Sequence, residues 1–369
     1  MAANLKYESF DKMESFMKDV FVKVGVPPED AEICADVLIE SDKRGIDSHG
    51  VGRFKPIYID RIKDGIQNPV TQFEVVKDHL ATAVVDGHDG MGQVIGKRSM
   101  QMAIDKAKSH GLGMVVVRNS THYGIAGYYA NMAVKAGMIG ITGTNARPSI
   151  APTFGIENML GTNPLTVGMP SDEDFPFILD CATSVSQRGK IEHYERIGKA
   201  MPEGWVINDD GSSETDPAKA LEGLTKGTSA LAPLGGLGED TAGYKGYGYA
   251  TIVEILSAAL QQGQFLKALN GFDANSKKIP YHLGHFFIAI DISAFVELEK
   301  FKKNTGDILR ELRDSRKAPG EKRIYTAGEK EYLAFLDRKE KGVPLNDSLI
   351  KTIKTLKDEY GLDSYKFDF

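Results

Sequence analysis

The sequence lacks the features that define several large protein classes. It has only two cysteines, Cys34 and Cys181, so no disulfide framework is expected and a reducing, cytoplasmic compartment fits. No apolar run approaches the ~18 residues of a membrane span, and the first residues show no signal-peptide core. The formal net charge of -6 argues against a nucleic-acid partner, which requires a basic surface.

Several catalytic patterns are missing as well. There is no H-E-x-x-H, paired-cysteine or acidic-cluster motif, so no metal site is expected. The G-x-S-x-G motif of serine hydrolases is also absent. Glycine, in contrast, is abundant at 39 residues and clusters within 87–96, 111–113 and 235–248, which indicates turns and close backbone approaches. The length of 369 residues suits one large domain or two to three smaller ones.

The order of apolar patterns predicts a helical start and end around an α/β body. Residues 1–80 are predicted to be helical, with helices over 7–24, 27–45 and 54–63, whereas strands and helices alternate from residue 82 onward. Strands are expected at 83–86, 113–117, 138–142, 165–168, 177–180 and 286–290, and helices at 93–110, 126–136, 186–197, 250–262, 295–316 and 348–360. Residues 205–216 are expected to form a polar insertion, and 231–249 a glycine-rich loop. This alternation is typical of an α/β protein.

A polar turn directly after the predicted strand 113–117 holds the main catalytic candidate, His122. A neutral imidazole at the end of a strand, taken here to be of the parallel type, can accept a proton near pH 7. Taken alone, His122 fits equally a histidine that only forms structural hydrogen bonds. The polar neighbours Ser120 and Thr121, with Gly124 allowing close approach to the backbone, favour a functional role.

Residues 90–96 follow a strand and precede a helix, as a dinucleotide fingerprint does. The spacing is G-x-G-x-x-x-G, however, and Arg118 rather than an acid follows the next strand. Arg118 as a binder of a 2′-phosphate is the only route to a Rossmann site, so a tight structural turn is favoured.

Other polar clusters carry two interpretations each. Residues 47–53 place an acid, a hydroxyl, an imidazole and Arg53 together, which fits a helix cap as well as a carboxylate site. Arg147 is either a second carboxylate clamp or a solvated arginine, and Asp180 either a ribose ligand or the cap of the following helix. Lys245 lies in the glycine-rich loop, where its charge suits a phosphate.

Taken together and in order, these clusters closely resemble the malate/L-lactate dehydrogenase family, which lacks a Rossmann fold and includes ureidoglycolate and sulfolactate dehydrogenases. The matching segments are 47–51 with Arg53, 119–124, 144–145, 161–164, 180–184, 189–190 and 245–248. The resemblance covers nearly the whole chain, and residues 145–164 and 284–291 look most like the malate dehydrogenase branch. It also decides the 90–96 question against a Rossmann cradle.

The resemblance implies a fold and a site. The fold would be α/β (α+β), with a non-Rossmann mixed-sheet NAD(P)-binding domain over 81–294 and a helical domain built from 1–80 and 295–369. The protein would be a homodimer with active sites near the subunit interface. His122 would be catalytic with His49 and Ser48. Arg53, Arg147, Asn145 and Thr162 would bind substrate, and Ala146, Asp180, Cys181, Ala182, Lys245, Pro319, Gly320 and Glu321 the cofactor. Ala146 stands where several family members have serine, which leaves only backbone contact there.

The implied activity is the interconversion of malate and oxaloacetate with NAD or NADP, with His122 taking the hydroxyl proton. The alternatives within this class are another 2-hydroxy-acid dehydrogenase and a keto-acid or cyclic-imine reductase. The alternative from another class is a non-catalytic protein that binds a dinucleotide.

Overall fold

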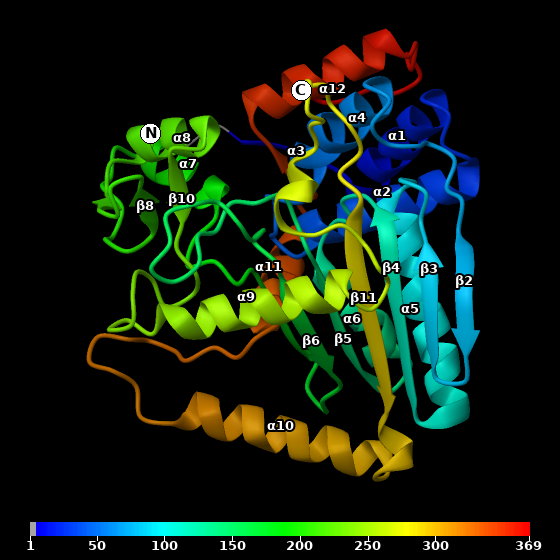
Figure 1. Cartoon of the computed structure of the whole chain (residues 1–369). Coiled ribbons are helices and arrows are strands. Elements are labelled where there is room, and N and C mark those ends of the chain that lie inside the picture. Colours follow the sequence, from blue (N-terminus) through cyan, green and yellow to red (C-terminus); the bar gives the residue numbers. More distant parts are fainter. Residues whose placement is uncertain (1–4) are drawn as a thin grey trace.

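The computed structural model describes residues 5–369, and a mixed seven-stranded sheet lies at its centre (Figure 1). The strands are ordered β2-β3-β4-β11-β5-β6-β7. Their bounds are Glu74–His79 (β2), Thr82–Asp86 (β3), Leu112–Ser120 (β4), Met138–Thr144 (β5), Leu165–Met169 (β6), Phe177–Cys181 (β7) and Leu283–Asp291 (β11). The sequence-based prediction of an α/β fold with a mixed, non-Rossmann sheet is therefore confirmed.

The strand that leads to His122 differs from the prediction in two ways. β4 continues to Ser120 rather than ending near residue 117, so His122 lies two residues beyond it. β4 is parallel only to β3, because β11 enters the sheet on its other side and runs antiparallel to both β4 and β5. The picture of a parallel-type strand is thus only half right. The end of the sheet near His122 is therefore formed by strands that run in both directions.

Helices cover both faces of the sheet. α5 (Gly92–His110) and α6 (Ala126–Lys135) pack on one face, and α9 (Gly243–Ala258) packs on the other, in front of the strands in Figure 1. The glycines at the start of α5 serve this packing, since a Cβ on Gly92 would lie 2.4 Å from the Thr121 carbonyl oxygen. Arg118 is ion-paired with Asp86 at 2.8 Å. The glycines of residues 90–96 and Arg118 therefore have structural roles in the fold.

A helical layer packs beside the sheet and joins the two ends of the chain. It contains α1 (Phe10–Lys23), α2 (Pro28–Lys43), α11 (Glu329–Arg338) and α12 (Asp347–Glu359), with a small sheet of β1 (Lys6–Glu8) and β12 (Val343–Leu345). Apolar residues from α1, α2 and α12 share one core with residues 51–59, as the helical spacing predicted. The prediction that all of 1–80 is helical is wrong at β1 and β2.

A smaller lobe follows β7. It holds α7 (Arg188–Arg196), α8 (Pro217–Lys226) and a three-stranded sheet of β8 (Val206–Asn208), β9 (Ser213–Glu214) and β10 (Ser229–Leu231). The polar insertion predicted over 205–216 is a hairpin with its turn at Gly211. The predicted loop 231–249 ends earlier than expected, because α9 begins at Gly243 and includes Lys245 in its first turn.

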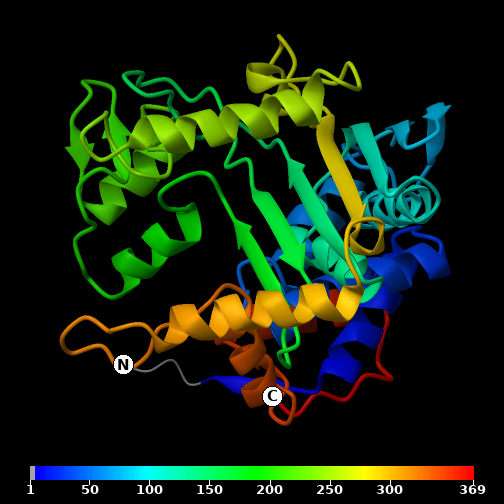
Figure 2. The same cartoon turned by 90° about the horizontal axis from the view of Figure 1, so that it is seen from below.

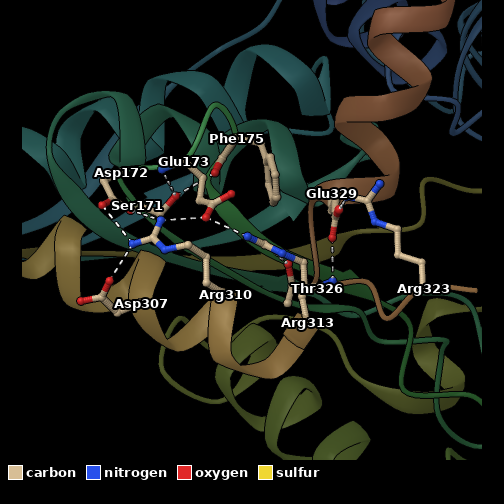
Figure 3. A network of polar contacts seen from close by, with 10 residues as sticks. All are labelled: Ser171, Asp172, Glu173, Phe175, Asp307, Arg310, Arg313, Arg323, Thr326 and Glu329. Carbon is tan, nitrogen blue, oxygen red and sulfur yellow. Dashed lines mark hydrogen bonds and ion pairs between the residues drawn. The ribbon is translucent and has the colours of Figure 1, made fainter. Parts of the chain in front are cut away.

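Helix α10 (Leu298–Asp314) crosses one end of the strands, below the sheet in Figure 1 and in front of it in the view from below (Figure 2). Figure 3 shows how it is held: Arg310 contacts Asp172 at 2.9 Å and Glu173 at 2.8 Å, in the turn between β6 and β7. Arg313 contacts Glu173 and also donates to Thr326, which lies just before α11. This hydrogen bond holds together the two ends of the loop between α10 and α11. Among residues 5–369 no helix has the length and apolarity needed to cross a membrane.

Candidate active site

The turn that carries His122 is fixed by hydrogen bonds on both sides. The Ser120 hydroxyl lies 2.8 Å from Nε2 of His285 on β11. The Thr121 hydroxyl accepts from the Gly92 N–H at 3.0 Å and donates to the Gly90 carbonyl at 2.7 Å. The polar residues of the turn therefore hold the backbone in place, and His122 is left as the side chain available for chemistry.

His122 has one ring nitrogen occupied and one without a partner. Its Nδ1 lies 2.7 Å from the Tyr58 hydroxyl and 3.3 Å from the backbone nitrogen of Gly124. Its Nε2 makes no hydrogen bond within residues 5–369. The ring of His49 stacks on the ring of His122 with centroids 5.8 Å apart. This arrangement suits a proton acceptor whose orientation is set from the Nδ1 side.

Tyr58 reaches His122 because the segment Phe54–Ile59 (η1) is a π-helix. The helical stretch predicted over 54–63 is confirmed, and its first six residues form a π-helix rather than an α-helix. A π-helix closes i→i+5 hydrogen bonds, so residues five apart lie over one another, and such turns are frequent at functional sites. Arg53, at the end of α3 (Val51–Arg53), and Tyr58 are five apart, and the short helix α4 (Asp60–Lys63) follows. Two polar side chains thereby reach one face.

A buried carboxyl group holds the loop that carries Ser48 and His49. Asp42 accepts a hydrogen bond from the Val51 N–H at 2.8 Å, and burial raises the pKa of Asp42 to about 8. Gly50 is required beside it, because a Cβ there would lie 2.2 Å from the Asp42 carboxyl. The Ser48 hydroxyl in turn lies 2.9 Å from Nδ1 of His49. The loop thus presents both side chains from a fixed backbone.

Cations surround the two histidines. Arg53 donates from Nε to the Ser48 carbonyl at 2.7 Å and forms no ion pair within residues 5–369. Burial, followed by the charges of His49, Arg61 and Arg53, holds the pKa of His122 well below its usual range. Burial and Arg53 lower the pKa of His49 to about 4. Both rings are neutral at pH 7, and the site carries a positive charge that an anionic ligand would balance.

A cavity of about 480 Å³ lies between the loop of Ser48 and His49 and the end of β7, and its lining includes neither His122 nor Arg53. It is lined by Ser48, His49, Gly124, Thr162, Asp180, Cys181, Ala182, Ser184, Ser186 and Lys190, among others. Residues more than 130 positions apart in the sequence therefore meet at one opening. A larger hollow of about 630 Å³ along α5 contains none of the predicted site residues.

Asp180 is anchored by the fold as well as exposed to this cavity. One carboxylate oxygen accepts from the Gly127 N–H at 2.6 Å and the other from the Thr166 hydroxyl at 2.9 Å. Asp180 therefore sits at the start of α6 rather than capping the helix that follows it. A carboxylate has further acceptor capacity beyond two hydrogen bonds, so Asp180 can still receive one from a ligand hydroxyl.

The remaining predicted residues lie outside the cavity. Asn145 is fully buried, and its amide accepts from the Gly284 N–H at 2.8 Å and donates to the Gln264 carbonyl. Ala146 is half-buried beside Gly161, and Arg147 is exposed. Lys245 is exposed on α9. The exposed residues Pro319, Gly320 and Glu321 lie in the loop after α10.

Sequence reasoning missed four polar residues at this site. Tyr58 lies five residues after Arg53, the wrong spacing for one face of an α-helix, and Arg61 follows it in the same helical segment. Ser184 and Ser186 line the cavity, and both hydroxyls are buried without a hydrogen-bond partner among the described residues. The polar run 183–186 after a strand end was the available signal for these two.

Comparisons with known proteins identify the family to which this mixed sheet and its histidine–arginine site belong. Residues 9–354 match the family model described as malate/L-lactate dehydrogenase. Malate dehydrogenase of Pyrococcus horikoshii is 44% identical over 353 residues, which is 96% of this chain and 95% of that protein. L-Sulfolactate dehydrogenase of Methanocaldococcus jannaschii is 41% identical over 94% of both chains.

Solved structures agree with this assignment. The crystal structure of malate dehydrogenase from Entamoeba histolytica superposes with a TM-score of 0.94 and 46% identity, covering 99% of this chain and 100% of that one. The chain therefore belongs to the malate/L-lactate dehydrogenase family. It is an oxidoreductase of that family, and malate dehydrogenases are among its most similar relatives.

Proposed function

We propose that this protein is an NAD(P)-dependent malate dehydrogenase that interconverts (S)-malate and oxaloacetate. The observation that carries the proposal is His122, whose Nδ1 is held by Tyr58 while its Nε2 has no hydrogen-bond partner among residues 5–369. The malate dehydrogenases at 43–44% identity support the choice of substrate. The cytoplasm is the proposed location.

The proton chemistry follows from the tautomer of His122. To accept the hydroxyl proton on Nε2, the neutral ring must carry its own hydrogen on Nδ1, so Nδ1 gives up the 3.3 Å hydrogen bond that it accepts from the Gly124 N–H. The Tyr58 oxygen, 2.7 Å from Nδ1, then accepts that hydrogen bond and stabilises the imidazolium that forms. In reduction His122 returns the proton from Nε2 to the carbonyl oxygen. Since neutral His122 is the resting form, malate oxidation starts from the protonation state that the site already favours.

The substrate would be oriented by the groups around this ring. Arg53 would hold the C1 carboxylate, because its guanidinium is unpaired and a fork of two N–H groups matches a carboxylate. Ser48 and His49 would contact the substrate from the adjacent loop. Thr162 would line the far wall of the cavity. Asn145 would act through the backbone that it holds at Gly284, and Arg147 is proposed as a carboxylate ligand at the rim.

The cavity residues fit a nicotinamide dinucleotide. The hydroxyls of Ser184 and Ser186 are buried there without a hydrogen-bond partner among the described residues. Hydroxyl or phosphate oxygens of a ligand would provide these partners. Asp180, Cys181 and Ala182 would lie against the cofactor, with backbone contact at Ala146. The bound cofactor would supply the hydride acceptor. The roles of Lys245 and of Pro319, Gly320 and Glu321 rest on the family resemblance, since these residues lie outside the cavity.

A homodimer is part of the proposal. Helix α9 is apolar on both sides, and Tyr249, Ile252 and Ile255 repeat every three residues on its outer side, where they are 50%, 49% and 53% exposed. An exposed apolar stripe of this kind marks a protein interface. A second copy of the chain packed on α9 would cover it.

The test is a panel of 2-keto acids assayed with NADH and with NADPH by absorbance at 340 nm, using the wild type and His122→Ala. Oxaloacetate should be reduced fastest. His122→Ala should lose at least about 10²–10⁴-fold in turnover, the usual contribution of general acid–base catalysis. Turnover unchanged by this substitution would refute the role of His122.

The other outcomes distinguish the alternatives. A faster reaction with another keto acid or with a cyclic imine would place the protein elsewhere in the same family. Cofactor binding without any turnover would indicate a non-catalytic dinucleotide-binding protein.

A further inference from the structure

Arg61 on α4 is a half-buried guanidinium with no acidic partner. It forms neither an ion pair nor a hydrogen bond within residues 5–369, and its guanidinium carbon lies 4.5 Å from the centre of the Tyr281 ring. Arginines away from the site do find acids, as in the pairs Arg44–Glu40, Arg118–Asp86 and Arg338–Asp47. Withdrawing an unpaired charge from water is costly, so an anion from outside the chain is the partner that Arg61 lacks.

Tyr281 fixes the position of this guanidinium. The Tyr281 ring packs so closely against Gly271 that a Cβ there would lie 2.6 Å from it. One side of the ring is thus backed by the main chain, and Arg61 lies over the ring. A guanidinium stacked on a fixed aromatic ring has little freedom to reorient, and its N–H fork is preorganised for a planar anion.

Arg61 also lies near the reacting centre. It follows Tyr58 by three residues, so both side chains lie on one helix face, and Tyr58 contacts His122. The charge of Arg61 contributes to the lowered pKa of His122. Burial lowers the pKa of Arg61, and the charges of Arg147 and Arg53 lower it further. The charges of Arg61 and Arg53 thus both act on the His122 imidazole, and among the described residues neither guanidinium has a carboxylate partner.

We propose that Arg61, rather than the rim residue Arg147, binds the second acidic group of the substrate, while Arg53 binds the carboxylate next to the reacting carbon. This assignment rests on the proposed function and extends it, because it makes Arg61 the residue that selects substrates with two anionic groups. Malate carries a second carboxylate where sulfolactate carries a sulfonate on the same carbon skeleton. One guanidinium can accept either group, whereas lactate offers it only a methyl group.

The kinetic test compares Arg61→Gln, Arg61→Lys and Arg147→Gln with the wild type. For Arg61→Gln, kcat/KM should fall about 30- to 1,000-fold with malate and sulfolactate, the range for removing one partner of a buried charge pair. Lactate should change by less than about threefold, because it makes no contact with Arg61. Arg61→Lys, which keeps the charge but loses the fork, should fall between wild type and Arg61→Gln with malate. Circular dichroism and thermal melting establish that each variant is folded.

A binding test separates failure of this inference from failure of the proposed function. Malonate and acetate are titrated into the protein by calorimetry, without cofactor and without turnover. Wild type should prefer malonate, and Arg61→Gln should lose that preference even if no 2-hydroxy acid is oxidised. The inference is overturned if wild type binds both anions equally, if Arg61→Gln weakens malate and lactate turnover by the same factor, or if only Arg147→Gln removes the selectivity.

Discussion

Replacing Tyr58 by phenylalanine removes one oxygen from the centre of the site and leaves its shape unchanged. The hydroxyl lies 2.7 Å from Nδ1 of His122, and the buried ring packs at 6.2 Å between centroids on Phe21 of the helical layer. Phenylalanine keeps that packing. Any change in catalysis should therefore come from the lost hydrogen bond and not from a rearranged core.

The size of the effect follows from the charge of the His122 imidazolium, which donates a hydrogen bond to the Tyr58 oxygen. A hydrogen bond to a charged group contributes about 1.5–3 kcal/mol, and about 1.4 kcal/mol corresponds to one pKa unit. Without Tyr58 the imidazolium of His122 loses this bond, while the Gly124 N–H at 3.3 Å still favours an unprotonated Nδ1. The pKa of His122 in the substrate complex should therefore fall by about one to two units, and oxaloacetate reduction at neutral pH by about 10- to 100-fold.

The assay is kcat against pH in both directions. Reduction needs protonated His122, so kcat falls as pH rises through the pKa, and a lower pKa moves this fall to lower pH. Oxidation needs the neutral ring, so its acid limb should move to lower pH as well. Tyr128→Phe is the matched control, because that hydroxyl contacts Asp36 instead. Loss of activity in Tyr58→Phe with both limbs unmoved would refute the reasoning.

Three further predictions concern the loop, the sheet and the α9 face. Gly50→Ala should displace the Asp42 carboxyl, raise KM and cost about 1–3 kcal/mol of stability, whereas Gly248→Ala, with no atom within 4 Å, should do neither in kinetic assays and thermal melts. Burial lowers the pKa of His285 to about 3, so the unfolded state takes up a proton first as pH falls below about 6.5. Stability should then be lost towards pH 3, and in urea titrations His285→Gln should lose up to about 1.4 kcal/mol less per pH unit than wild type. Ile252→Glu should convert a dimer to monomers in light scattering, whereas Lys303→Glu on exposed α10 should not; a monomeric wild type would contradict the interface.

Much of the sheet could be predicted because its strands are buried and apolar. β2 could not, since all six of its residues are exposed and no alternation marks it. The start of α9 was placed too late because its first turns contain glycines, which normally indicate a loop. In the small lobe, β8 and β9 pair within a hairpin of polar sequence, and β10 pairs with β8 from beyond α8.

The candidate site was predictable where reactive residues follow strands or gather in one loop. His122 stacks on His49, and Ser48 and His49 line the cavity. Tyr58 and Arg61 were not predictable, because the rule that places side chains on a helix face assumes α-helical spacing. The structural task of Asn145 was equally hidden, since its partner Gly284 lies 139 residues away.

In the π-turn over Phe54–Ile59, the number of residues determines the direction in which the following side chains point. Each residue of an ordinary helix advances the side chains by about 100°, so deleting one residue here would rotate everything after the turn by that amount relative to Arg53. The core contacts of the preceding loop would be untouched. The extra residue of the π-turn thus sets the angle between the side chains of Arg53 and Arg61. In the proposed site, this angle determines the distance between the two acidic groups of the substrate.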